Sequence, residues 1–473
     1  MTATPPSAPE QAAAPLAFDP LDTLLNEPSA RLAHSFSHLP PAASAFDNAN
    51  SRDAMAAVLN QVADRLADNY PYFHPLYAGQ MLKPPHPIAR AAYALAMTVN
   101  PNNHARDGGR ASSQMEIEAV AQIAAMFGWQ THLGHLTSGG TFANLEALWV
   151  AGRLAPGKRV LASDQAHYTH SRISAVLQLP FSSVASDQKG RIDLNTLEDQ
   201  LRKGDVGTVV ATLGSTALGS VDPLPEILAL RDRYGFRVHV DAAYGGYFRL
   251  IADSLDAPAR LAFEAIDRAD SIVVDPHKHG LQPYGCGCVL FSDPAIGRFY
   301  KHDSPYTYFT SHELHLGEIS LECSRAGAAA VALWATQQIL PLTPGGEFAR
   351  GLAAGRRAAL ELDRRLRHDP RFTAFSAPPE LDIVVWKVQA SSGKESSRLA
   401  QRIFDISATL DLHLALVQLP RMIFPIETQD NEPGGDRKDS VTCLRSVFMK
   451  PEHVDWLDAI WARLDQAARQ AAT

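Results

Sequence analysis

The chain has 473 residues, of which 46% are hydrophobic, and it carries a formal net charge of −8. This length allows large buried cores and suggests two or three structural units. The mildly acidic balance gives no basic surface for nucleic acid or anionic membrane, and no apolar segment approaches the roughly 20 residues that span a bilayer. The N-terminus also lacks the basic region and apolar core of a secretory signal, so we expect a cytoplasmic protein.

The first hundred residues predict a leader followed by helices. Residues 1–17 are rich in Ala and Pro, which is typical of a disordered leader. Residues 18–100 have a largely helical pattern, and 52–69 repeat apolar residues at three- and four-residue spacing. Prolines punctuate 70–87 and predict loop or broken turns there.

Residues 101–345 alternate helical patterns with short β-branched runs, which is typical of a large α/β domain. The periodicity predicts helices at Met115–Phe127 and Thr141–Leu154. Because several β-branched runs are apolar on both faces, they predict strands of a buried, mostly parallel sheet covered by helices. These runs are Arg159–Ala162, Thr208–Leu213, Arg237–Val240, Ser271–Val274 and Gly287–Phe291.

Residues 346–473 predict a small C-terminal α+β domain. An Arg/Ala/Leu-rich helix is expected at Gly351–Arg367, followed by one strand at 380–389. Two further helices are expected at 397–410 and 453–470.

A Gly-rich turn directly before the helix expected at 141 is the first feature with chemical content. It consists of Ser138, Gly139, Gly140 and Thr141. Two glycines let the backbone approach an anion closely, and the free N–H groups and the helix dipole stabilise that anion. Thr141 adds a hydroxyl donor and could cap the helix. Taken alone, the turn is better interpreted as an ordinary Gly-rich loop with an N-cap.

Two strand ends add a lysine and a carboxylate. SIVVDPHKHG places Lys278 after one apolar run, and HVDAAYGG ends an earlier run in Asp241. A lysine that forms an imine, with a carboxylate that keeps a pyridine nitrogen protonated, is what pyridoxal 5′-phosphate (PLP) needs from a protein. The small side chains of Ala242 and Ala243 would let a flat ring pack there. A lone lysine at a strand end is usually a solvated charge, but the order of turn, Asp241 and Lys278 favours a PLP site.

Four motifs, TSGGTFAN, SDQAHYTH, HVDAAYGG and DPHKHG, resemble those of the group II PLP-dependent amino-acid decarboxylases. That family includes glutamate, aromatic-amino-acid, histidine and tyrosine decarboxylases, and the resemblance runs from about Phe73 to about residue 450. It implies a type I PLP-dependent transferase fold, like that of aspartate aminotransferase, and a homodimer with its active site near the subunit interface. It also implies decarboxylation of an L-amino acid to an amine and CO₂ through a Schiff base on Lys278.

The resemblance further implies roles for single residues. His167 matches a histidine that stacks on the cofactor ring, where a neutral imidazole can also hydrogen-bond the substrate carboxylate. Thr216 matches a hydroxyl near the phenolic oxygen of the cofactor, and His277 precedes the lysine as in the family. The phosphate cup is matched by Gly139, Gly140 and Thr141.

Two features depart from the family or leave its roles open. Many members have asparagine where this chain has Asp275, so a second carboxylate is expected near the phosphate. The mobile catalytic loop should fall at 301–318, where Tyr308, or else Tyr306, would protonate Cα after decarboxylation. A position there without a hydroxyl would favour oxidative aldehyde formation.

Several alternatives stay open at this stage. The chain could be another PLP carbon–carbon lyase or an aldehyde synthase on the same scaffold, or a non-catalytic PLP-binding protein. Arg325 is either an anion contact or a structural salt bridge. The sequence does not identify the amino-acid side chain that the enzyme accepts.

A metal site is disfavoured at both places that suggest one. His312, Glu313 and His315 form HExH rather than HExxH, and no second Cys/His pair with zinc spacing accompanies Cys286 and Cys288.

Overall fold

The computed structural model describes residues 21–40, 52–105, 107–301, 320–421, 423–424 and 440–473. Contacts divide the chain into two units, Met1–Ala45 and Phe46–Thr473. The first unit contributes one described helix, α1 (Leu21–Ser35). The second begins with α2 (Arg52–Leu66), close to the helix predicted at 52–69. Among the described residues, no helix is both long and apolar enough to span a bilayer. The leader predicted at 1–17 lies outside the described residues.

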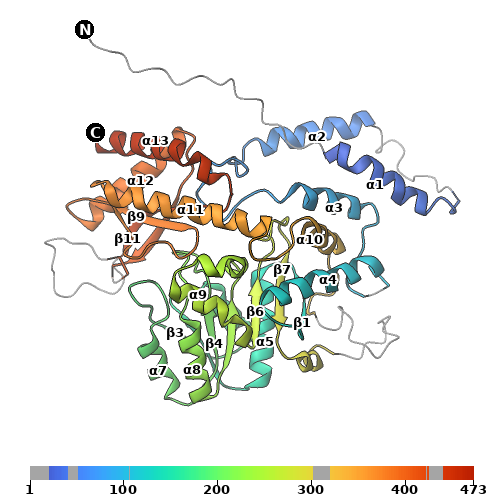
Figure 1. The fold of residues 1–473 in the computed structure, drawn as a ribbon, viewed down its shortest axis with the longest axis horizontal. Coiled ribbons are helices and arrows are strands. Elements are labelled where there is room, and N and C mark those ends of the chain that lie inside the picture. Colours follow the sequence, from blue (N-terminus) through green and yellow to red (C-terminus); the bar gives the residue numbers. More distant parts are fainter. Residues whose placement is uncertain (1–20, 41–51, 106, 302–319, 422, 425–439) are drawn as a thin grey trace, which may run out of the picture. The chain divides into compact units, whose positions relative to one another are not determined.

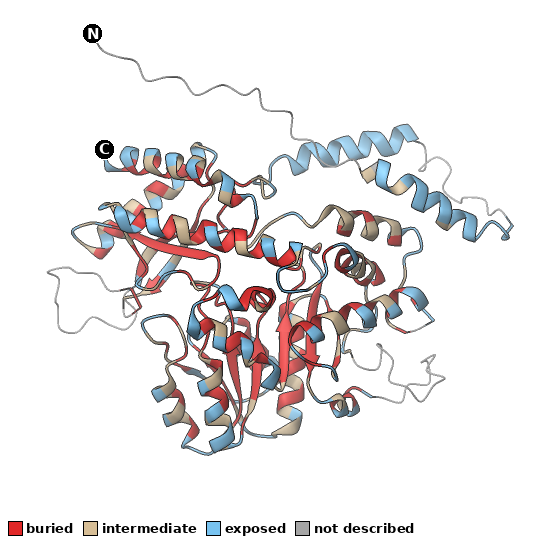
Figure 2. Ribbon diagram, viewed as in Figure 1, coloured by how far each residue is buried: buried red, intermediate tan, exposed pale blue. Residues whose placement is uncertain are grey.

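A seven-stranded sheet forms the centre of the second unit, with the strand order β1-β7-β6-β5-β4-β2-β3. Its four inner pairings from β3 to β6 are parallel, and β7 runs antiparallel to both β6 and β1. Figure 2 shows the strands buried between layers of helices. The predicted α/β class with a mostly parallel sheet is therefore confirmed. The strands are β1 (Leu133–Thr137), β2 (Arg159–Ser163), β3 (Phe181–Val184), β4 (Val206–Thr212), β5 (Arg237–Asp241), β6 (Ser271–Val274) and β7 (Gly287–Phe291).

Helices cover this sheet, and the two predicted ones are found. The helix predicted from 115 is α4 and begins at Arg110, while the helix predicted from 141 is α5 and begins at Gly140. The helices are α3 (Pro87–Met97), α4 (Arg110–Met126), α5 (Gly140–Leu154), α6 (Thr169–Val176), α7 (Leu194–Leu201), α8 (Leu224–Tyr234), α9 (Ala257–Glu264) and α10 (Gly327–Ile339). The described residues also form the 3₁₀ helices η1 (Gly246–Ser254), η2 (Ile266–Arg268) and η3 (Pro294–Phe299).

The C-terminal region is built on a smaller antiparallel sheet with the order β10-β11-β9-β8. Its strands are β8 (Phe372–Ala374), β9 (Ile383–Val388), β10 (Ala415–Pro420) and β11 (Ser440–Val447), and its helices are α11 (Glu347–His368), α12 (Gly393–Thr409) and α13 (His453–Ala472). The predicted small α+β layer is present, although the sequence predicted only one of these strands. The domain boundary expected near 345 falls between α10 and α11 and stays a prediction.

The large sheet brings its parallel strand ends to one edge. The last residues of β4 and β5 are Thr212 and Asp241, and Asp275 follows directly after β6. Because the carboxyl ends of parallel strands meet at one edge, side chains far apart in sequence converge there.

Candidate active site

A cavity of about 400 Å³ lies at this edge of the large sheet. Its walls come from the turn before α5, the segment after β2, the ends of β4 and β5, and the segment after β6. Every described residue that the sequence proposed for a cofactor lines it, namely Gly139, Gly140, Thr141, His167, Thr216, Asp241, Ala243, Asp275, His277 and Lys278. Tyr306 and Tyr308 lie outside the described residues.

Asp241 is a buried carboxylate held in its ionised form. One oxygen, Oδ2, lies 2.8 Å from His170 Nε2 and accepts a hydrogen bond from Asn144 Nδ2 at 3.3 Å, while Oδ1 accepts from the Ala243 N–H at 3.1 Å. Burial acts to raise the pKa of Asp241, but the hydrogen bond with His170, together with the nearby positive charge of Lys278, outweighs burial and lowers it. The side chain therefore carries a negative charge at neutral pH.

A second layer of polar groups fixes Asp241 in place. Asn144 on α5 accepts a hydrogen bond at 2.8 Å from His239 Nε2, and the His239 Nδ1 lies 2.9 Å from Ser271 Oγ. Burial lowers the pKa of His239 to about 3, so this imidazole stays neutral. The sequence reasoning assigned no role to Asn144 or His170, although both stand inside quoted motifs (TSGGTFAN and SDQAHYTH).

Lys278 forms an ion pair at the opposite wall. Its Nζ lies 3.0 Å from Asp275 Oδ2, and only 3% of the Asp275 side chain is exposed. The other Asp275 oxygen, Oδ1, is buried without a hydrogen-bond partner among the described residues. His277 Nε2 lies 3.5 Å from the same carboxylate, and His277 Nδ1 donates to the Cys286 carbonyl at 2.8 Å.

The start of α5 fits a phosphate group. Gly139 is the N-cap, φ 156°, no side chain caps the helix, and the first residues of α5 line the cavity. A Cβ on Gly140 would lie 2.7 Å from Asp275 Oδ2, so only glycine leaves room there. An uncapped helix start of this kind binds anions through its N–H groups and dipole. The expectation that Thr141 caps α5 is wrong, because the helix already begins at Gly140.

His167 and Thr216 complete the wall. Burial lowers the pKa of His167, so the ring is neutral near pH 7, and its Nδ1 lies 2.8 Å from Thr169 Oγ1. The Thr216 carbonyl accepts a hydrogen bond at 2.7 Å from Arg445, a buried side chain of β11. The small sheet thereby braces the rim of the cavity. Neutral imidazole, ionised Asp241, paired lysine and open helix start together fit the aldehyde, ring nitrogen and phosphate of PLP.

Arg325 takes no part in the cavity wall. Its Nη1 lies 2.6 Å from Glu116 Oε1 on α4 and donates to the Leu136 carbonyl at 2.8 Å, and its Nη2 donates to the Asn103 carbonyl at 3.1 Å. Both charged side chains are under 10% exposed. Of the two readings left open by the sequence, the geometry favours the structural salt bridge.

Of the residues that suggested a metal site, the structure describes Cys286 and Cys288. Burial raises the pKa of the Cys286 and Cys288 thiols, which keeps both protonated and poor as ligands. No group of three His, Cys, Asp or Glu side chains suited to a metal occurs in the described part of the chain. His312, Glu313 and His315 fall outside that part.

Comparisons with known proteins agree with the geometry. The family model described as "Pyridoxal-dependent decarboxylase conserved domain" matches residues 47–389. An L-tyrosine decarboxylase of Enterococcus faecium is 28% identical over 85% of this chain and 86% of its own. A probable L-tyrosine/L-aspartate decarboxylase of Methanothermobacter thermautotrophicus is 28% identical over 69% and 86%. The structure of Oryza sativa TDC with PLP and tryptamine is similar with a TM-score of 0.77 at 16% identity, covering 97% of this chain and 99% of that one, which confirms the predicted fold.

Proposed function

Because this chain belongs to the pyridoxal-dependent decarboxylase family and decarboxylates an L-amino acid with PLP, we propose how its residues divide that reaction and which substrates it accepts. The observation that carries the assignment of residues is the convergence of Lys278, Asp241 and the uncapped start of α5 in one cavity.

Three parts of the cavity would hold the cofactor. Lys278 would carry it covalently, the N–H groups at Gly139, Gly140 and Thr141 would bind its phosphate, and Asp241 would face its ring nitrogen. When bound, PLP supplies an electron-accepting ring beside Cα, which stabilises the electron pair left when CO₂ departs. Because Asp241 stays ionised, it would hold a proton on the ring nitrogen of the bound cofactor.

The remaining residues orient the substrate and handle protons. The imidazole of His167, whose lowered pKa keeps it neutral, would lie against the cofactor ring and donate a hydrogen bond to the substrate carboxylate. Asp275, 3.0 Å from the Lys278 Nζ, would hold that amine in place, and Thr216 and Ala243 of the cavity wall would border the cofactor. A hydroxyl of Tyr308, or of Tyr306, protonates Cα after CO₂ has left, which yields the amine rather than an aldehyde.

For the substrate we propose L-tyrosine or L-aspartate. Support comes from the names of two relatives that cover most of this chain, an L-tyrosine decarboxylase and a probable L-tyrosine/L-aspartate decarboxylase. The test is mass spectrometry of products after the PLP-loaded enzyme is incubated with each of the twenty amino acids, diaminobutyrate and cysteine sulfinate. Tyramine or β-alanine supports the proposal, whereas another amine overturns the substrate and an aldehyde overturns the protonation step.

The role of Lys278 has its own test. Borohydride reduction of the loaded enzyme, followed by peptide mapping, should place the label on Lys278, and a label elsewhere would overturn the assignment. The variant Lys203→Met is the matched control and should be labelled to the same extent as the parent, because Lys203 is exposed on the surface beside α7.

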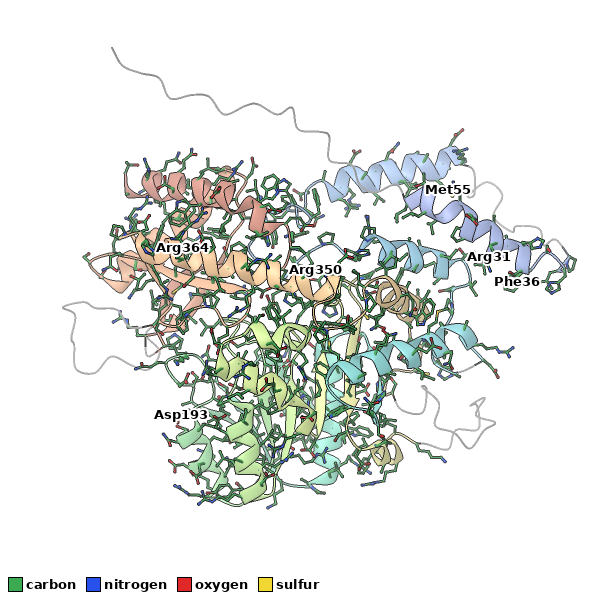
Figure 3. All side chains as sticks on the ribbon, in the orientation of Figure 1. Arg31, Phe36, Met55, Asp193, Arg350 and Arg364 are labelled. Carbon is green, nitrogen blue, oxygen red and sulfur yellow. The ribbon has the colours of Figure 1, made fainter. Side chains whose placement is uncertain are left out.

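We also propose that the protein is a homodimer. Helix α2 has no buried residue, and five apolar side chains spaced three or four residues apart are each 44–65% exposed: Met55, Val58, Leu59, Val62 and Leu66. Figure 3 labels Met55 on this helix. Since exposed apolar stripes mark association surfaces, a second copy is the occupant we propose. Light scattering should give twice the chain mass and the double variant Val58→Asp, Val62→Asp a lower one; a monomeric parent would exclude the dimer.

All four cysteines are free thiols and three of them are buried. This supports the proposal of a reducing, cytoplasmic compartment, which fractionation of cells that express the protein would test.

A further inference from the structure

A second cavity, of about 550 Å³, is lined from three parts of the chain that are distant in sequence. Residues 83–87 form one wall, the start of α11 another, and residues 449–452 a third. Most of the lining is apolar and includes Phe73, Pro85, Leu340, Phe348 and Met449. The two cavities share no lining residue. They are close in sequence at one place, because His279 and Leu281 of the second cavity follow Lys278 of the active-site cavity.

Two lysines on its walls lack a carboxylate partner. Lys450 is 4% exposed; its Nζ donates to the Tyr77 carbonyl at 2.7 Å and lies 5.3 Å from the centre of the Tyr77 ring. The Nζ of Lys83 donates to the Met449 carbonyl at 3.4 Å. An ammonium group has three donors, and one hydrogen bond within the described part of the chain is seen for each of these two. Each therefore has donors left over in a mostly apolar cavity.

The cavity lowers the pKa values of both lysines. Burial, and after it the positive charge of Lys83, lower the pKa of Lys450 to about 7, although Glu452 acts in the opposite direction. Burial likewise lowers the pKa of Lys83 to about 8. Bringing a negative ligand between the two would reverse this effect, because it would compensate both charges at once.

The neighbouring charged groups do not supply that compensation. Asp382 acts on Lys83 from a distance, but its carboxylate accepts a hydrogen bond from Tyr244 and lies 3.3 Å from His279. Glu347, Arg350 and Glu452 are exposed at the rim, and His86 and His279 complete the titratable lining. Figure 3 labels Arg350 on α11. Solvated carboxylates at a rim stabilise buried ammonium groups only weakly.

We propose that this cavity binds a small organic anion, with its carboxylate between Lys83 and Lys450 and its apolar body against Phe73, Phe348 and Met449. Sites that bind such ligands pair an apolar lining with a few convergent polar groups, as here. The site is separate from the catalytic cavity, so its occupancy does not depend on the reaction proposed above.

The first test uses the PLP-loaded enzyme, so that the catalytic phosphate site is filled, and phenylacetate as the probe. Isothermal titration should show phenylacetate binding, with no heat from phenylacetamide, which has the same shape without the charge. Lys83→Met and Lys450→Met should each weaken binding about tenfold or more, and Lys203→Met should not change it. Two single variants guard against one that fails to fold.

Binding should also depend on pH. The anion needs both lysines protonated, so affinity should be highest below pH 7 and fall as pH rises through 7 to 8, where the free lysines lose their protons. No binding to the parent enzyme, equal binding of phenylacetamide, or binding unaltered in both lysine variants would overturn the proposal. The last result would place phenylacetate in the catalytic cavity, where it would compete with substrate.

Discussion

The two cavities differ in whether a carboxylate neutralises their lysines, although Lys278 lines one cavity and its neighbour His279 lines the other. In the catalytic cavity, Lys278 has Asp275 at 3.0 Å, and the anion-binding groups are the backbone N–H groups at the start of α5. In the second cavity, the Nζ atoms of Lys83 and Lys450 donate hydrogen bonds to backbone carbonyls, and that of Lys450 also lies over the Tyr77 ring. A lysine that must react is held beside a carboxylate, whereas lysines that only attract an anion are left uncompensated. The difference separates a site built for chemistry from one built for binding.

The largest effect should follow from removing the compensated lysine. Lys278→Ala should lower kcat at least about 1,000-fold, because the variant loses both the covalent attachment of the cofactor and the amine beside the reacting carbon. The measurement is amine production under saturating substrate. If turnover persisted above one hundredth of the parent value, a different lysine would carry the cofactor.

The ion pair of Arg325 and Glu116 lines neither cavity, so it tests what the loss of a charged partner costs in stability without a change in either site. Arg325→Met leaves Glu116 buried without its partner and should lower the free energy of unfolding by about 3–5 kcal/mol. Chemical denaturation measures this loss, and Arg364→Met on the exposed face of α11, labelled in Figure 3, is the control that should leave the midpoint unchanged. PLP affinity should stay at the parent value in molecules that remain folded. A large loss of affinity at unchanged stability would restore the anion-contact reading.

The catalytic cavity could be predicted from sequence because its residues stand in four short motifs, each at a strand end or helix start. The strands at Ser271–Val274 and Gly287–Phe291 were predicted to the residue, since they are continuous apolar runs. Strand β1 was missed because LGHLT contains a glycine and a histidine. Inside the fold, His135 Nε2 lies 2.9 Å from Glu146 Oε2 of α5, a proximity that no local pattern reveals.

The second cavity lay beyond sequence reasoning for a different reason. Lys83 stands in a proline-rich loop and Lys450 after β11, and neither belongs to a motif that implies an anion. The two lysines come to line one cavity only in the folded protein, where Lys450 donates a hydrogen bond to the Tyr77 carbonyl. Asn144 and His170 escaped for the same reason, because each acts through Asp241 on another element.

A smaller effect is expected from neutralising the charge that faces the cofactor ring. Asp241→Asn keeps the shape but cannot hold a proton on the ring nitrogen, so kcat should fall about 100-fold. The pKa of Asp241 lies below its ordinary value, so the parent side chain stays ionised down to acid pH and this loss should be the same from pH 6 to 8. Steady-state kinetics across that range is the measurement. An unchanged kcat would show that the reaction does not need the negative charge.

The smallest effect is expected from removing the carboxylate beside Lys278, which leaves that lysine without an acidic partner, as Lys83 and Lys450 are in the second cavity. Asp275→Asn removes the carboxylate 3.0 Å from Lys278 and the negative charge beside the start of α5. The second loss favours the cofactor, because its phosphate meets less electrostatic repulsion. The apo-protein should bind PLP about tenfold more tightly at pH 7.5, measured by absorbance titration, with Asp199→Asn on the exposed face of α7 as the control. Weaker binding would mean that Asp275 contributes more to PLP affinity by positioning Lys278 than it costs by repelling the phosphate. The main role of the ion pair would then be to fix the position of the lysine.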